Sequence, residues 1–269
     1  MGNLGHTFLF EAGGIAALGG VHTYTVPNQM DGTLGLAAIE AAIRPDQDPH
    51  FPITRLVILE NTQNRCGGVV LSADYTQAVA NLAHNHGLQL HIDGARIFNA
   101  AVALNIPAVA LTKPADSVTF CLSKGLCAPV GSVLCGSKEF IYHARRIRKQ
   151  LGGGMRQAGI LAAAGLVALD QMIDRLAEDH QQARELANLI GGIPEIQIDP
   201  GSPATNMIFM ELQPDYPDVA KNVAERLAKQ GVFVGVVGEK RFRLVTHNDI
   251  KKTDLVRVVE EFTKAVNLF

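Results

Sequence analysis

Short apolar runs alternate along the first two thirds of the chain with longer stretches whose apolar residues recur at helical spacing. Such short apolar runs predict buried strands. The runs lie at 56–59, 88–92, 116–122 and 130–135. Ser72 is a candidate N-cap and Gly87 a stop signal for a helix over 72–86, and a basic helix is expected at 137–150. The alternation predicts βαβ units, a mostly parallel sheet and an α/β fold.

The pattern changes in the last third of the chain. The stretch 155–189 is too long for one ordinary helix, so we expect a bend in it, and its first part is rich in Ala and Gly and is predicted to be buried. Short strands and one helix follow, at 206–212, 219–230 and 242–245. This change in the spacing of apolar runs indicates a second, smaller part of the molecule.

Composition narrows the function classes. The chain has 269 residues, 47% of them hydrophobic, which is enough for a large core, and its net charge of −2 does not favour binding to nucleic acid or a membrane surface. No apolar run approaches the roughly 20 residues needed to span a bilayer, and the first residues lack a signal-peptide pattern. The cysteines form no Cys-x-x-Cys pair and predict buried free thiols, hence a reducing, cytoplasmic location. They are Cys66, Cys121, Cys127 and Cys135.

Two predicted strand ends carry candidate chemistry. His91-Ile92-Asp93-Gly94-Ala95-Arg96 follows one strand, and Ser123-Lys124-Gly125 follows the next. Ligands bind at the carboxyl edge of such sheets. A lysine amine that forms an imine with an aldehyde, and a carboxylate that keeps a ring nitrogen protonated, suit pyridoxal phosphate (PLP). Taken alone, Asp93 is more often a helix cap or turn former, and the Ser-Lys-Gly turn a solvated loop.

The surrounding sequence favours the PLP interpretation. The motifs are HIDGARIFNA over 91–100, CLSKGL over 121–126 followed by APVGS, and LGGGMRQAG over 151–159. Together they resemble the threonine aldolase family, in the same order, with similarity from His6 to His247. The resemblance implies the aspartate aminotransferase fold (fold type I), with a large PLP-binding domain over 1–170 and a small α+β domain over 171–269. It also implies reversible cleavage of threonine and related β-hydroxy-α-amino acids to glycine and an aldehyde, by a homodimer or homotetramer.

The resemblance assigns roles to single residues. Lys124 would hold the cofactor and act in catalysis, with Asp93 at the ring nitrogen and Arg96 near the ring hydroxyl. His6 would stack on the ring and join proton transfer, and Arg243 would bind the substrate carboxylate through its planar fork. Without the family, Arg96 is a surface ion pair, His6 a solvated histidine and Arg243 a strand-end charge.

Contacts to the cofactor phosphate are expected from two further residues. Arg156 follows three glycines and is predicted to open a helix, so the side chain and the helix N-terminus could act together. Ser123, next to the lysine, could donate a hydrogen bond, although a turn-forming serine is equally consistent with its position. His84, His86 and His91 superficially suggest a metal site, but no acidic or thiol ligands accompany them, so we expect no metal.

The chain departs from the family pattern in two places. Gln63 follows Glu60-Asn61-Thr62 where the family has a histidine near the substrate hydroxyl, and glutamine cannot act as a base near neutral pH. His6 or a water would then take the hydroxyl proton, or Gln63 merely orients the substrate. Met1-Gly2-Asn3 resembles the tail of the family's phosphate-binding turn, so the chain looks shortened at its start, which would weaken cofactor binding.

Two alternatives to an active aldolase therefore stay open. One is a PLP-fold protein with impaired or no turnover that persists as a partner subunit. The other is a different PLP reaction on the same scaffold, such as β-elimination or transamination, which Asp93 and Lys124 alone do not distinguish.

Overall fold

The computed structural model describes residues 1–267, which divide into two compact units. Unit 1 is Met1–Asp174, and unit 2 begins at Arg175. Each unit has its own sheet and its own hydrophobic core.

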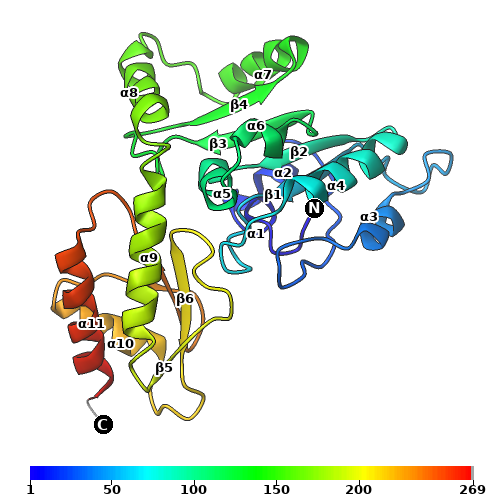
Figure 1. Ribbon diagram of the computed structural model, residues 1–269. Helices are drawn as coiled ribbons and strands as arrows, with labels where there is room; N and C mark the ends of the chain where they lie inside the picture. Colours follow the sequence, from blue (N-terminus) through cyan, green and yellow to red (C-terminus); the bar gives the residue numbers. More distant parts are fainter. Residues whose placement is uncertain (268–269) are drawn as a thin grey trace. The chain divides into compact units, whose positions relative to one another are not determined.

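The sheet of unit 1 has the order β1-β2-β3-β4 (Figure 1). The first three strands are parallel and β4 is antiparallel to β3, so the sheet is mixed but mostly parallel, as predicted. The bounds are β1 (Leu56–Glu60), β2 (Gln89–Asp93), β3 (Ser117–Cys121) and β4 (Ser132–Gly136). All four strands lie within two residues of the positions that their apolar runs indicate.

Helices follow the strands of unit 1 and pack on the sheet. Apolar residues of β1 and β2 pack with α4, and Ile92 of β2 packs with α5 and α6. The helical segments are α1 (His6–Leu9), η1 (Glu11–Gly13), α2 (Gly14–Ala17), α3 (Leu36–Ala42), α4 (Ala73–Asn85), α5 (Ile97–Leu104), α6 (Ala108–Thr112), α7 (Lys138–Gln150) and α8 (Gly159–Gln171).

The predicted N-cap of α4 is confirmed, and α7 also begins at a serine cap. The Ser72 hydroxyl accepts a hydrogen bond from Tyr75 N–H at 3.1 Å at the start of α4, and Ser137 accepts one from Phe140 N–H at 3.2 Å at the start of α7. Gly87, with a left-handed φ of 69°, follows α4 where a stop was expected.

Unit 2 is an antiparallel sheet of order β5-β6-β8-β7 packed with three helices. Its core includes Phe242 of β8 and Phe262 of α11, whose rings meet edge to face at 5.7 Å. The elements are α9 (Leu176–Ile190), β5 (Ile196–Ile198), β6 (Met207–Leu212), α10 (Ala220–Lys229), β7 (Gly235–Val236), β8 (Arg241–Val245) and α11 (Lys252–Val266). The predicted break within 155–189 lies between α8 and α9.

Two predictions about burial are wrong. The Ala- and Gly-rich α8 is mostly exposed: only Gly165 and Ala168 are buried, and Ile160 is 73% exposed. Ile160, Leu166 and Val167 of this helix are exposed within residues 1–267. The four cysteines are free, but none is buried; Cys127 is exposed in a loop, and the others are half-buried.

Within residues 1–267, no helix is both long and apolar enough to cross a bilayer. The same residues contain no group of three or more His, Cys, Asp or Glu side chains able to hold a metal ion.

Candidate active site

The turn that carries Asp93 runs directly beside β3. Asp93 ends β2, and Gly94 N–H donates to the Thr119 carbonyl at 2.8 Å. Two residues further along β3, Cys121 N–H donates to the Ala95 carbonyl at 3.4 Å. A Cβ on Gly94 would lie 2.9 Å from the Thr119 oxygen, so only glycine permits this approach. The half-buried Asp93 is thereby fixed at the carboxyl edge of the sheet.

Lys124 lies three residues beyond the end of β3, in the loop that leads to β4. Three backbone hydrogen bonds shape this loop. Leu122 N–H donates to Gly131 O at 2.9 Å, Ala128 N–H to Leu122 O at 3.0 Å, and Cys127 N–H to Lys124 O at 2.9 Å. Since Cys121 also bonds to Ala95, a span of three residues, at most about 11 Å, separates Lys124 from the Asp93 turn along the chain. Lys124 is half-buried.

His6 reaches the same edge through Glu60. Glu60 ends β1 and is the register partner of Asp93. Its Oε2 accepts a hydrogen bond from His6 N–H at 2.6 Å, and its Oε1 accepts one from Asn64 N–H at 2.9 Å. The half-buried His6 ring lies 4.9 Å from the Phe10 ring and 3.3 Å from the exposed carboxylate of Glu11.

Glu60 is a polar group of this edge to which the sequence interpretation gave no role. Burial raises the pKa of its carboxyl, and the nearby charge of Asp93 contributes in the same direction, whereas the hydrogen bonds from Asn64 and His6 oppose the shift. The signal that could have found Glu60 is its position, because Glu60 stands at the end of a predicted strand, as Asp93 does.

Gln63 is buried, with 1% exposed, and its amide bonds to the backbone. Nε2 donates to the Leu4 carbonyl at 3.0 Å, and Oε1 accepts from Cys66 N–H at 2.7 Å. The Gln63 amide therefore connects the N-terminal turn with the loop after β1. The expected contact between Gln63 and the substrate hydroxyl stays a prediction.

The two residues expected to bind the phosphate, Ser123 and Arg156, lie in separate loops. Ser123 is exposed, and its hydroxyl donates to Gly131 O at 3.5 Å. Arg156 is also exposed and lies three residues before α8, which begins at Gly159. The prediction that Arg156 opens this helix is wrong, because the residues after the glycines form a turn first. Arg96 is half-buried and is the N-cap residue of α5.

Arg243 lies in unit 2, on the central strand β8, opposite Phe209 of β6 and Gly235 of β7. It is half-buried. The neighbouring Thr246 donates through its hydroxyl to the Asp179 carbonyl of α9 at 2.6 Å.

The three histidines that resembled a metal cluster have separate partners. His84 lies 2.9 Å from Asp116, and His86 lies 3.4 Å from Glu40. His91 projects from β2 to the hydroxyls of Ser117 and Thr119 on β3, at 2.8 and 3.3 Å. Burial lowers the pKa of His91, so its neutral ring is favoured.

The Asp93 and Lys124 loops fit the ring-binding part of PLP. A half-buried carboxylate and a half-buried amine follow adjacent parallel strands, which is where open α/β sheets bind ligands. At the same edge, the buried Thr62 hydroxyl has no hydrogen-bond partner among the described residues, and an added polar ligand could satisfy it.

Comparisons with known proteins find similarity to threonine aldolases. The chain is 45% identical to the low-specificity L-threonine aldolase 1 of Arabidopsis thaliana over 99% of its own length and 75% of that protein. It is 41% identical to the low specificity L-threonine aldolase of Escherichia coli K12, over 96% and 74% of the two chains. A solved Leishmania major threonine aldolase superposes with a TM-score of 0.80 at 23% identity, covering 98% of this chain and 76% of that one.

The fold is that of the fold type I proteins, which include threonine aldolases and aminotransferases. A family model described as "Beta-eliminating lyase" matches residues 1–213. The chain belongs to the threonine aldolase family within these lyases.

Proposed function

We propose that this protein is a PLP-dependent threonine aldolase that cleaves L-threonine, L-allo-threonine and related β-hydroxy-α-amino acids to glycine and an aldehyde. The observation that carries the proposal is the pairing of the Asp93 turn with the strand that leads to Lys124. Membership of the threonine aldolase family supports the substrate class, because its named relatives are low-specificity L-threonine aldolases.

We propose the following roles toward the cofactor. Lys124 would hold PLP through its amine, and Asp93 would hold a proton at the ring nitrogen. When bound, PLP supplies an electron sink for the bond that breaks at the substrate α-carbon. Arg96, Ser123 and Arg156 are proposed as further cofactor contacts, in line with the family motifs in which they lie.

Substrate orientation is assigned to Arg243, whose guanidinium could bind the α-carboxylate in a bidentate manner. The hydroxyl proton must leave for the carbon–carbon bond to break. We assign its removal to His6 or a water molecule, because the Gln63 amide is not basic and already bonds to Leu4 and Cys66.

The protein is also proposed to work as a homodimer or homotetramer in the cytoplasm. Support for assembly comes from the exposed apolar side chains near and on α8, which are Met155, Ile160, Leu166 and Val167. Free cysteines support a reducing compartment.

The test is product analysis with purified protein, PLP and L-threonine. We expect acetaldehyde and glycine in equal amounts, and loss of both with Lys124→Ala. Release of ammonia and a 2-oxo acid in place of acetaldehyde would instead identify an elimination reaction. Bound PLP with no turnover of either kind would contradict the proposed activity.

A further inference from the structure

The carboxyl group of Glu60 joins three segments that are distant in sequence. It stands at the end of β1, while its two oxygens accept hydrogen bonds from the first residue of α1 and from the loop after β1. The contact to His6 spans 54 residues. Because these N–H groups belong to a helix start and a loop, neither has a partner within a strand ladder, and Glu60 supplies both acceptors.

Glu60 also stands beside Asp93. Residues in register on neighbouring parallel strands point to the same face of the sheet, about 4.8 Å apart. The charged and titratable groups that act on Glu60 are therefore Asp93 from β2 and His6 from α1. Glu60 thus bonds to the backbone of His6, the proposed stacking residue. It also lies next to Asp93, the proposed partner of the ring nitrogen.

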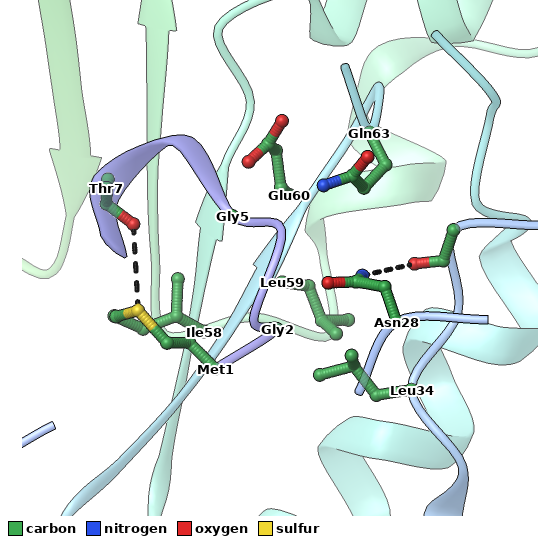
Figure 2. A pocket seen from close by; sticks show the side chains of 11 residues that line it. Met1, Gly2, Gly5, Thr7, Asn28, Leu34, Ile58, Leu59, Glu60 and Gln63 are labelled. Atoms are coloured by element: carbon green, nitrogen blue, oxygen red, sulfur yellow. Dashed lines mark hydrogen bonds between the residues drawn. The ribbon is translucent and has the colours of Figure 1, made fainter. Parts of the chain in front are cut away.

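Gln63 supports the same turn from a second direction, by donating to Leu4 only two residues before His6. Figure 2 shows Glu60 and Gln63 beside the turn that contains Gly5. The void that these residues line measures about 10 Å³, enough for one water molecule at most. Little empty space therefore separates Glu60 and Gln63 from Gly5 and Thr7, the residues on either side of His6.

We propose that Glu60 is a positioning residue of the site: it holds the His6 segment against the carboxyl edge of the sheet and adds a negative charge beside Asp93. The inference rests on the proposed function. Glu60 contacts neither substrate nor cofactor in this account; it acts through His6 and Asp93.

Two variants separate geometry from charge. Glu60→Gln removes the charge and replaces one acceptor oxygen by a donor, and we expect PLP to bind about 10-fold more weakly. The visible band of bound PLP, whose pH dependence reports the proton on the Lys124 nitrogen, should titrate at lower pH, by on the order of half a unit, since a nearby negative charge that favours the cation is lost. Glu60→Asp keeps the charge but shortens the side chain. It should weaken PLP binding and leave the titration midpoint near that of the wild type.

The matched control is Glu40→Gln, which makes the same charge change at an exposed carboxylate beside His86. Glu40→Gln should change neither the affinity for PLP nor the pH midpoint of the visible band. Hydrogen exchange of the segment 4–10 gives a readout without cofactor: exchange should be faster in both Glu60 variants than in the control.

The outcomes distinguish the two proposals. If the wild type binds PLP and cleaves threonine, but Glu60→Gln matches it in affinity, midpoint and exchange, the positioning role is wrong and the proposed function stands. If the wild type binds no PLP, both are overturned. If Glu60→Gln does not fold, Glu60→Asp decides the geometric part, and wild-type affinity and exchange in that variant would overturn it.

Discussion

At the scale of single residues, the proposed function depends on two side chains of opposite charge at one edge of a sheet. Asp93 is fixed by backbone bonds from its turn to β3, and Lys124 lies in a loop closed by three backbone bonds. Both groups are half-buried, so their charges are less screened than those of surface groups. The surrounding backbone, rather than the two side chains themselves, determines where they stand.

Asp93→Asn tests the carboxylate directly. Asparagine has almost the same shape but no negative charge, so it cannot hold a proton at the ring nitrogen. We expect kcat for threonine cleavage to fall by roughly 10²–10⁴-fold, the range for loss of a proton-holding group. Asp74→Asn, an exposed carboxylate in the first turn of α4, is the control. A wild-type rate in Asp93→Asn would remove this residue from the mechanism.

His180 provides a prediction about stability in unit 2. This histidine of α9 is 2% exposed, and burial, with a contribution from Arg184, lowers its pKa from 6.5 to about 4. Between these values the unfolded chain binds a proton that the folded one does not. Its contribution to the free energy of unfolding is therefore complete above pH 6.5 and is lost as the pH falls toward 4, by on the order of 3 kcal/mol.

The measurement is urea unfolding at several pH values for the wild type and His180→Gln. The difference in the free energy of unfolding between the wild type and His180→Gln should narrow as the pH falls from 6.5 to 4. A difference that does not vary with pH in this window would show that His180 takes up its proton equally in both states.

At the scale of elements, the α4 cap gives a local test. Ser72 is exposed and its hydroxyl accepts from Tyr75 N–H, so Ser72→Ala removes one bond and no packing. We expect the free energy of unfolding to fall by about 1 kcal/mol. Ser72→Asp retains an acceptor and should remain close to the wild type. Equal losses in both variants would mean that the cap is not the cause.

Local patterns predicted the elements that depend on local causes. The strands β1 to β3 and the helix α4 follow from apolar runs, a serine cap and a stopping glycine, all within a few residues of one another. The same local reasoning predicts Asp93 and Lys124 as candidate site residues, because both are polar residues after predicted strands.

Contacts between distant segments were not predictable in this way. The roles of Glu60 and Gln63 come from partners 54 and 59 residues away, which no local pattern reports. The sequence prediction starts α8 too early, because three glycines and an arginine are equally compatible with a turn. The burial of α8 was misjudged for another reason: an apolar helix has the same pattern whether its own chain or a partner covers it.

At the scale of the whole molecule, assembly is the property that this apolar helix predicts. Leu166→Lys places a charge on the exposed side of α8 and should shift the protein toward smaller species in sedimentation velocity. For the wild type we expect a dimer or a larger species. Val256→Lys on α11 is the control, because Val256 is also exposed but lies in unit 2. A monomeric wild type would contradict the proposed assembly.

Lys124 is the residue proposed to bind PLP, and reductive trapping identifies the lysine that does so. The protein is incubated with PLP, reduced with borohydride and digested, and the peptides are analysed by mass spectrometry. We expect a pyridoxyl group on Lys124 and an unmodified peptide in Lys124→Ala. A pyridoxyl group on another lysine, or on none, would contradict it.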